Sequence, residues 1–160
     1  MQTPVRVLFI CTGNCCRSQM AEALLRHMAP EGFQACSAGF RPAGFVHPLV
    51  VETLARRGIS VQGQYSKHWD VYAGQEFDII VTLCDQAGMD PMPAWPGRPV
   101  IVHWPLKDPA FHPGTEDECL MIASEVADAL RRRLQRLISL DLHRMSHEQA
   151  EAAVRELATM

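Results

Sequence analysis

The sequence predicts an α/β fold: a single domain in which a four-stranded parallel sheet carries helices on both faces. Three observations lead to this prediction. Short apolar, β-branched runs alternate with longer segments in which apolar residues recur every three or four positions. Glycine and proline separate these segments. A length of 160 residues suits one domain with a sizeable core.

The predicted strands are short and apolar. The first begins at Val5 and its apolar run stops at Cys11. The third, FDIIVTL, is the clearest and ends directly before Cys84. Because helical segments lie between them, successive strands are expected to run parallel. The predicted strands span residues 5–10, 33–37, 77–83 and 99–104.

The predicted helices begin and end at residues that favour helix termini. Thr115 with Glu118, and Ser146 with Gln149, have the spacing of a capping box, and Gly58 is expected to stop the second helix. The third helix has one apolar face and a basic run near its end, which is expected to be solvated. That run comprises Arg131, Arg132, Arg133 and Arg136. The predicted helices span residues 18–29, 49–57, 115–138 and 146–158, with a short helical turn over 69–72.

The composition is that of an ordinary soluble globular protein, with 48% apolar and 21% charged residues. A net charge of −3 argues against nucleic acid as the main partner. No long apolar run and no secretion signal are present, so a cytoplasmic protein without membrane contact is expected. Six cysteines in such a protein indicate catalytic or redox-active thiols. No metal site is predicted, because the histidines and cysteines lack metal-ligand spacing.

One stretch, VRVLFICTGNCCRS, combines a strand, a tight loop and the start of a helix. Cys11 follows the strand, and Arg17 comes six residues later. Such a loop turns backbone N–H groups onto an oxyanion, and the positive end of the helix dipole favours both the anion and a thiolate at Cys11. The Arg17 guanidinium adds donors suited to a tetrahedral oxyanion. The predicted substrate-binding loop comprises Thr12, Gly13, Asn14, Cys15, Cys16, Arg17 and Ser18.

Two further reactive side chains follow predicted strands, where parallel sheets bind their ligands. Cys84 comes after the third strand and Asp108 after the fourth, so both are expected near Cys11. Each also has a purely structural interpretation. Cys84 suits an apolar strand end, and an aspartate before proline, as at Asp108, often caps a turn. Cys36 and Cys119 are expected in the core.

Several motifs occur in the order found in one known family. They are CTGNCCRSQMAEALL from residue 11, SAG at 37–39, VTLC at 81–84 and HWPLKDPA at 103–110. They resemble the arsenate reductases built on the low-molecular-weight protein tyrosine phosphatase fold, over about residues 5–136. The resemblance implies a phosphatase-like arsenate reductase domain over residues 1–140 and a C-terminal helical extension over residues 141–160.

The resemblance implies reduction of arsenate to arsenite for arsenic detoxification, with phosphate and sulfate as substrate analogues. Cys11 would be the nucleophile, Arg17 the oxyanion ligand and Asp108 the acid that assists the leaving oxygen. Cys84 would then attack the sulfur of Cys11, so that arsenite leaves and a disulfide remains. No bound cofactor is implied, but an external thiol has to reduce the disulfide.

Within the loop, Asn14 resembles the family's loop-shaping asparagine, and Ser18 resembles the hydroxyl that hydrogen-bonds the nucleophilic thiolate. Cys16 matches the family's second loop cysteine, whereas Cys15 replaces a serine and adds a thiol. Pro91 stands where thioredoxin-coupled members carry a third cysteine. A glutathione and glutaredoxin-like system is therefore expected as the reductant ahead of thioredoxin. Cys15 and Cys16 are expected to pack within the loop.

Thioredoxin-coupled relatives that bind potassium resemble this chain at Asn14, Glu22 and Ser37. The aspartate that they add after a serine appears here as Lys67, which follows Ser66. A lysine ammonium there would compete with the cation for the same oxygens. Little effect of potassium on activity is therefore expected.

Two other functions remain open. A low-molecular-weight protein tyrosine phosphatase shares the loop and the Asp-Pro pair, but it usually has tyrosines where this chain has Ala110 and Phe111. An aromatic wall for its substrate would have to come from Tyr65, Trp69 or Tyr72. A non-catalytic oxyanion or arsenite redox sensor would need the loop without the complete set of nucleophile, arginine and acid.

Overall fold

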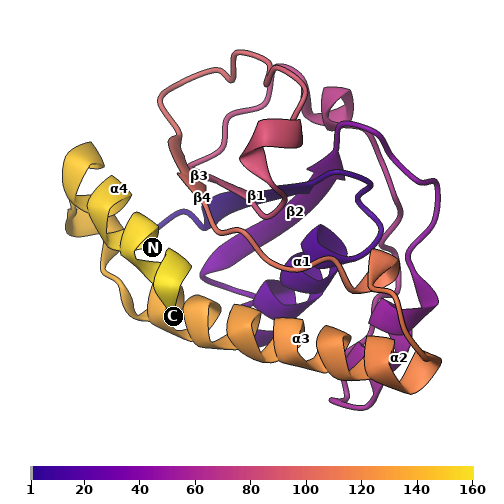
Figure 1. Cartoon of the computed structure of the whole chain (residues 1–160). Helices are drawn as coiled ribbons and strands as arrows, with labels where there is room; N and C mark the ends of the chain where they lie inside the picture. The colour runs from indigo at the N-terminus through magenta and orange to yellow at the C-terminus, as the bar shows by residue number, and fades with distance from the viewer. Residues whose placement is uncertain (1) are drawn as a thin grey trace.

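The computed structural model describes residues 2–160, and its centre is a sheet of four parallel strands in the order β2-β1-β3-β4 (Figure 1). The number and direction of the strands are those predicted. β1 lies between β2 and β3, and it is buried along nearly its whole length. The strands are β1 (Val5–Cys11), β2 (Phe33–Gly39), β3 (Ile79–Thr82) and β4 (Val100–His103).

Helices cover both faces of the sheet, as predicted, but one face carries α-helices and the other carries short 3-10 helices. The α-helices α1, α2 and α3 pack together below the sheet in Figure 1, and the short 3-10 helices η1 and η2 lie above it. The connection from β1 to β2 carries α1 and runs in the direction opposite to the two later connections. The long connection from β2 to β3 contributes to both layers, because α2 packs beside α1 and α3 while η1 lies on the other face. The helices are α1 (Arg17–Met28), α2 (Pro48–Ala55), α3 (Glu116–Ser139), η1 (Trp69–Tyr72) and η2 (Gln86–Gly88).

Every predicted strand and α-helix is present, with its ends within two residues of the prediction. β3 is shorter than predicted and begins at Ile79, while Phe77 before it packs edge-on against Trp95 with ring centroids 5.9 Å apart. The Ser146 capping box forms completely. At Thr115 only half of the predicted box forms, because the Thr115 hydroxyl donates to the Glu118 carboxylate at 3.2 Å. No helix in the described part of the chain is long and apolar enough to cross a membrane.

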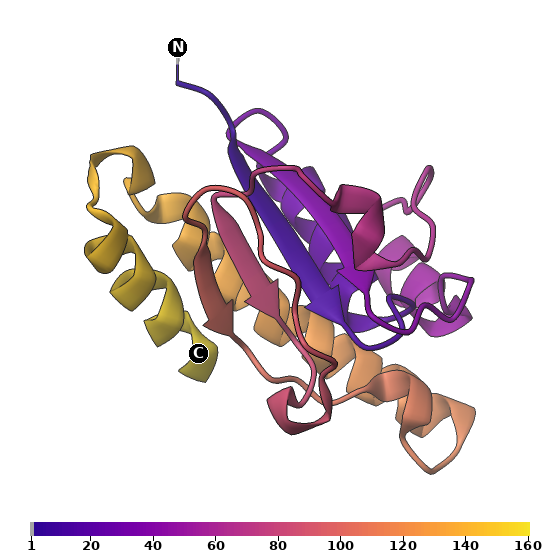
Figure 2. The ribbon, with the colours of Figure 1, turned by 90° about the horizontal axis from the view of Figure 1, so that it is seen from above.

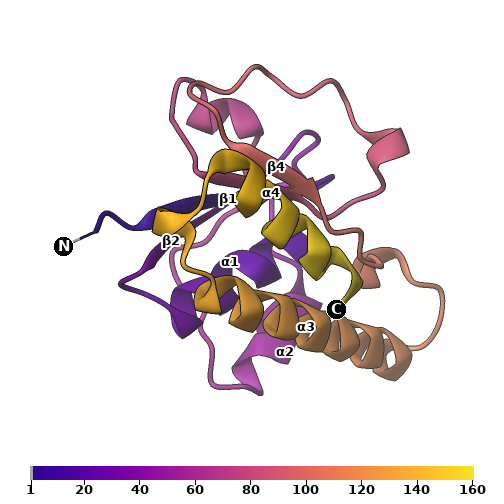
Figure 3. The same ribbon diagram turned by 90° about the vertical axis from the view of Figure 1, so that its left-hand side faces the viewer.

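The chain after α3 folds back onto the edge strand β4 (Figure 3). Trp104, just past β4, is fully buried, and its Nε1 donates to Val154 O at 3.0 Å. Arg98 and Glu148 add an exposed ion pair of 3.2 Å. This segment therefore covers an edge of the sheet that would otherwise be open. It consists of η4 (Leu142–Arg144), α4 (His147–Glu156) and η5 (Leu157–Thr159).

The basic run near the end of α3 is not wholly solvated, so that prediction was wrong for one residue. Arg131, Arg132 and Arg136 are exposed, but Arg133 is only 6% exposed and its guanidinium lies 6.0 Å from the centre of the Trp104 ring. Burial lowers the pKa of Arg133. The side chain is part of the packing between α3 and the β4 edge.

The carboxyl ends of the four strands meet at one edge of the sheet, toward which all four arrowheads point in Figure 2. The register pairs Cys11 with Gly39, and it pairs Thr82 with both Ile10 and His103. The loops that follow these strands therefore leave the sheet close to one another.

Candidate active site

The loop between β1 and α1 is held in shape by one asparagine. Asn14 has a φ of 46°, and in the described part of the chain it is the one non-glycine residue in the left-handed region. Its Nδ2 donates to Ser18 Oγ at 2.8 Å and to Ser37 Oγ at 3.0 Å. Its Oδ1 accepts from the backbone N–H of Lys67 at 3.0 Å. These bonds stabilise the left-handed conformation and tie the loop to β2.

Close packing of β2 against the loop leaves room only for glycine at one position. A Cβ atom on Gly39 would lie 2.6 Å from Thr12 O and 2.9 Å from Asn14 N. Backbone atoms cannot move aside as the end of a flexible side chain can, so a larger residue would displace the loop. The SAG motif thus has a packing reason that its pattern alone did not indicate.

The thiol of Cys11 is buried at the base of the loop. Cys11 is 2% exposed, and its Sγ lies 2.8 Å from Ser18 Oγ. Because Ser18 Oγ already accepts a hydrogen from Asn14 Nδ2, its own hydrogen is free to point at the sulfur. The Ser18 hydroxyl is therefore placed as a donor to Cys11.

The guanidinium of Arg17 is buried and held by acceptors from two other loops. Its Nη1 donates to Leu106 O at 3.1 Å and Leu83 O at 3.3 Å, and its Nη2 donates to Asp108 Oδ2 at 3.2 Å. Its Nε is buried without a hydrogen-bond partner among the described residues. The N-cap residue of α1, Cys16, makes no side-chain cap in the described structure. This Nε and the N–H groups of the first helical turn can bind an oxyanion.

Asp108 caps a turn, as its structural interpretation predicted, and it also reaches Arg17. Its Oδ1 accepts from Ala110 N at 3.0 Å and caps the 3-10 helix η3 (Pro109–Phe111). Its Oδ2 pairs with Arg17, and its side chain is 22% exposed. The turn therefore holds one carboxylate oxygen and directs the other to the rim of the anion loop.

Cys84, two residues beyond β3, is buried beside the same loop. Burial raises the pKa of the Cys84 thiol, while a hydrogen bond with the Thr12 side chain and the Arg17 guanidinium oppose this shift. An apolar strand end would account for the burial of Cys84 but not for these polar neighbours. The structure thus brings Cys84 and Arg17 together near Cys11, as the convergence of strand ends predicted.

The other four cysteines fall into two groups. Cys15 and Cys16 are buried in the loop, as predicted, and burial raises the pKa of Cys15 to about 11 and also raises that of Cys16. Thiols with such pKa values react slowly at neutral pH. Cys36 and Cys119 are only partly buried, so their prediction as core residues was wrong. Cys36 lies on the edge strand β2 and Cys119 near the start of α3, where less structure surrounds them.

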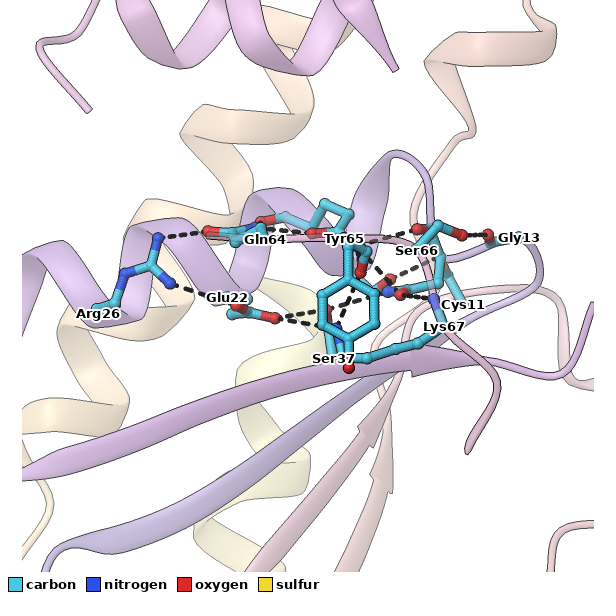
Figure 4. Close-up of polar contacts among 12 residues, drawn as sticks. Cys11, Gly13, Glu22, Arg26, Ser37, Gln64, Tyr65, Ser66 and Lys67 are labelled. Carbon is cyan, nitrogen blue, oxygen red and sulfur yellow. Dashed lines mark hydrogen bonds and ion pairs between the residues drawn. The ribbon is translucent and has the colours of Figure 1, made fainter. Parts of the chain in front are cut away.

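A chain of polar contacts runs from the loop to a buried lysine, as Figure 4 shows. Ser37 Oγ accepts from Asn14 and donates to Glu22 Oε1 at 2.6 Å. Lys67 Nζ lies 3.9 Å from the same Oε1 and donates to Tyr65 O at 3.0 Å. The Lys67 ammonium therefore lies beside the Glu22 carboxylate and the Tyr65 carbonyl oxygen. Its position after Ser66 in the sequence predicted such a place near these oxygens.

The sequence did not reveal two glutamines in this network. Gln19 is fully buried, and its Nε2 donates to Asn14 O at 3.0 Å and to Tyr65 O at 2.9 Å. Gln64 Nε2 donates to Gln19 Oε1 at 2.7 Å. A glutamine in the first turn of a helix is normally solvated, so only the fold shows that Gln19 supports the loop.

Of the three candidates for an aromatic wall, Tyr65 is the exposed one, with 57% of its surface accessible. Trp69 is buried, and Tyr72 packs edge-on against Phe77 at 5.5 Å. Within the described residues, no three histidine, cysteine, aspartate or glutamate side chains are grouped as metal ligands.

Comparison with known proteins identifies related sequences. The sequence profile of the low molecular weight phosphotyrosine protein phosphatase family matches residues 6–150. The arsenate reductase of Halalkalibacterium halodurans is 36% identical over 129 residues, which cover 81% of this chain and 91% of that protein. The glutaredoxin arsenate reductase of Synechocystis sp. is 27% identical over 134 residues, 84% of this chain and 96% of that protein.

Solved structures share the fold. An arsenate reductase in the phosphate binding state matches with a TM-score of 0.70 and 26% identity, over 84% of this chain and 97% of that one. The thioredoxin-dependent arsenate reductase of Corynebacterium glutamicum matches with a TM-score of 0.60 and 33% identity, over 84% of this chain and 64% of that one. The profile match spans most of the chain, and the chain therefore belongs to the low molecular weight phosphotyrosine protein phosphatase family.

Proposed function

We propose that the chain reduces arsenate to arsenite, with Cys11 as the nucleophile and Cys84 as the second thiol. The observation that carries this proposal is the position of Cys84, buried beside the anion loop in contact with Thr12 and near Arg17. An enzyme that only hydrolyses a phosphate ester needs one thiol at such a loop, whereas a reductase needs two. The arsenate reductases that align over most of the chain support the same choice.

The anion loop and three side chains serve the first step. Arsenate oxygens would accept from backbone N–H groups at the start of α1 and from the free Nε of Arg17. The Cys11 sulfur, with Ser18 Oγ 2.8 Å away, attacks arsenic and forms a sulfur–arsenic bond as one arsenic–oxygen bond breaks. Asp108 supplies a proton, so that the oxygen leaves as water.

The second step transfers two electrons. The Cys84 thiolate attacks the Cys11 sulfur, and the electron pair of the sulfur–arsenic bond stays with arsenic, which leaves as trivalent arsenite. Two thiols become one disulfide, which balances the reduction of arsenic. Since burial raises the pKa of Cys84, the Thr12 side chain and the Arg17 charge assist the loss of its proton at this step.

Replacement of Cys84 tests the proposal. Cys84→Ser is expected to abolish arsenate reduction yet leave weak hydrolysis of p-nitrophenyl phosphate, because only the redox step needs a second thiol. Cys36→Ser is the matched control, since it removes a partly buried thiol from β2 and should keep both activities. Full arsenate turnover by Cys84→Ser would contradict the assignment.

Replacement of the other two groups tests the first step. Cys11→Ser is expected to lose both activities. Asp108→Asn keeps an oxygen that can cap η3, so it should slow both activities by about 100- to 10,000-fold through loss of the acid rather than through unfolding. Unchanged rates in Asp108→Asn would remove Asp108 from the mechanism.

A phosphotyrosine phosphatase is the second candidate, and the exposed ring of Tyr65 favours it as a wall for an aromatic substrate. An oxyanion or arsenite sensor is the third. The three differ in turnover. The reductase consumes arsenate, the phosphatase hydrolyses p-nitrophenyl phosphate efficiently without reducing arsenate, and the sensor binds oxyanions without either reaction.

The external reductant is a thiol-redox system. One relative is a glutaredoxin arsenate reductase and another is a thioredoxin-dependent arsenate reductase, which supports electron donors of this class. Pro91 offers no third thiol, and this favours glutathione with a glutaredoxin-like protein over thioredoxin.

A further inference from the structure

Under the proposed function, Asp108 has to hold its carboxyl group beside the oxygen that leaves arsenic. Only residues 105–107 separate Asp108 from Trp104, which directly follows β4. Pro105 and Lys107 are exposed. Since this short segment has little packing of its own, the position of Asp108 depends in part on how firmly Trp104 is held.

Backbone hydrogen bonds connect the segment to the end of β3 and to the arginine of the anion loop. Trp104 N donates to Thr82 O at 2.8 Å, and Leu106 N donates to Leu83 O at 3.1 Å. Leu106 O accepts from Arg17 Nη1 at 3.1 Å, and the same guanidinium pairs with the proposed acid. A shift of Trp104 would therefore be passed along this segment to the turn that carries the acid.

The Trp104 side chain is held by the C-terminal segment, which consists of η4, α4 and η5. Its indole is fully buried, and Nε1 donates to Val154 O at 3.0 Å. Val154 lies in the last turn of α4, where helix carbonyls lack a complete set of helical partners and can accept from other groups. Among the described residues, Val154 O is the one hydrogen-bond partner of the indole N–H. Loss of this bond would leave a buried donor unpaired.

The C-terminal segment is itself well packed at this point. Val154 is fully buried, and Ala150 and Leu157 on either side of it are buried as well. α4 lies against β4, as Figure 3 shows, and η5 contacts α3. Val154 also lies beyond residue 150, where the match to the family profile ends. The contact therefore belongs to a part of the chain that the profile does not cover.

We propose that Trp104 is a positioning residue for Asp108, the acid of the proposed function on which this inference rests, and that the C-terminal segment anchors it through Val154 O. With the indole held by α4, β4 ends at a fixed place and the turn presents the Asp108 carboxyl group to the leaving oxygen. Without this bond the unpaired indole N–H shifts toward solvent. The carboxyl group then spends less time where it can give its proton.

Hydrogen exchange of single amides, followed by NMR, tests the anchor without any activity. The Leu106 amide donates to the end of β3, so its exchange rate reports how firmly the segment before Asp108 is held. Trp104→Phe keeps an aromatic ring but removes the donor to Val154 O. The Leu106 amide is expected to exchange about two- to tenfold faster in this variant, the range that corresponds to loss of one hydrogen bond.

The dependence of hydrolysis on the leaving group tests the positioning of the acid. Phenol is a poorer leaving group than p-nitrophenol, so phenyl phosphate needs the proton from Asp108 more. Trp104→Phe should lower kcat/KM for phenyl phosphate about two- to tenfold and that for p-nitrophenyl phosphate by less. Half-protection of Cys11 from iodoacetamide should need the same phosphate concentration, because Arg17 keeps its bond to Leu83 O at 3.3 Å.

Trp95→Phe is the matched control for Trp104→Phe. Trp95 is buried as well, but its Nε1 has no hydrogen-bond partner among the described residues. The control therefore removes the same part of an indole without breaking a hydrogen bond, and it should change neither readout. The Met20 amide, which donates to Cys16 O at 2.9 Å at the start of α1, reports general loosening in each sample.

Val154→Ala provides a second variant that leaves the indole intact. It removes buried atoms from α4 at the anchor, so both readouts should move in the same direction as in Trp104→Phe. Val126→Ala on α3 makes the same change at another buried valine, and it should leave both readouts unchanged. If Trp104→Phe does not fold, this pair of variants decides the outcome.

An unchanged exchange rate at Leu106 in the folded Trp104 and Val154 variants would overturn the anchor, and so would an equal rise in the controls. Faster exchange with equal losses on both phosphate esters would overturn the positioning of Asp108. The exchange measurement does not depend on the reaction. If Cys84→Ser keeps full arsenate turnover while both readouts move as expected, the role of Trp104 stands and the redox role of Cys84 falls.

Discussion

Lys67 Nζ lies 3.9 Å from Glu22 Oε1, and both side chains are buried next to the anion loop. Lys67 also donates to Tyr65 O at 3.0 Å and lies 4.6 Å from the centre of the Tyr65 ring. Burial lowers the pKa of Lys67, and the Glu22 carboxylate opposes this shift. Through Ser37 and Asn14, this ion pair is connected by hydrogen bonds to the loop that surrounds Cys11.

The position of Lys67 predicts that activity is insensitive to potassium. Rates in potassium and sodium salts of equal ionic strength should agree, because the ammonium already pairs with the oxygens that a monovalent cation would use. Lys67→Met, which removes the charge at similar length, should make the rate and the thermal stability depend on the cation. A several-fold specific activation of the parent protein by potassium would show that Lys67 does not fill this role.

The anion loop predicts selective protection of Cys11. Iodoacetamide should label Cys11 faster than the other two loop thiols, Cys15 and Cys16, since burial raises the pKa of those two. Sulfate, phosphate or arsenate should slow the labelling of Cys11, because the anion occupies the loop in front of the sulfur. If oxyanions leave the rate unchanged, the loop does not bind them.

The absence of a sulfur at Pro91 predicts the electron donor. The oxidised enzyme should stop at a Cys11–Cys84 disulfide or at a mixed disulfide of Cys84 with a small thiol. Steady-state assays should give faster turnover with glutathione and glutaredoxin than with thioredoxin alone. Peptide mapping after one turnover provides the second measurement, and a Cys84 disulfide with any cysteine other than Cys11 would reveal an internal relay.

The packing at Gly39 predicts a sharp response to one methyl group. Gly39→Ala should displace the backbone at Thr12, lower both catalytic rates and destabilise the fold by about 1–3 kcal/mol. Gly32→Ala is the matched control, because a Cβ atom there would meet nothing within 4 Å. Denaturant unfolding and the two rate assays measure these effects. Equal behaviour of the two variants would rule out a packing role for Gly39.

The burial of His103 predicts a loss of stability in acid. Burial lowers the pKa of His103 below its usual 6.5, with Asp85 opposing, so the folded protein binds this proton less tightly than the unfolded chain does. The free energy of unfolding should therefore fall as the pH decreases through 6.5 toward the folded-state pKa, and it should fall less in His103→Gln. Identical pH dependence of both proteins, measured by denaturant unfolding, would show that His103 makes no such contribution.

The amino-acid sequence by itself determined the parts of this protein that depend on neighbouring residues. Short, nearly continuous apolar runs placed the strands, since the central strands of a parallel sheet are buried on both faces. A repeat of about 3.6 residues placed the helices, because each buries one face. Cys11, Arg17 and Ser18 lie within one strand, loop and helix start, so local geometry alone brings them together. The capping box at Ser146 and Gln149 is local in the same way, and it forms as predicted.

Only the tertiary structure decided which distant residues meet and which side chains are buried. The order of the strands predicted that Asp108 lies near the anion loop, but only the structure shows that its carboxylate contacts Arg17, 91 positions away, at 3.2 Å. Arg133 is buried where α3 packs near Trp104, beyond β4. The helical pattern of α3 alone does not show this contact. The need for glycine at 39 comes from backbone packing, and propensity does not encode it. Apolar patterns and helix caps involve residues that are close in the sequence, so the sequence alone predicts them. Contacts between distant residues form only once the strands and helices have packed.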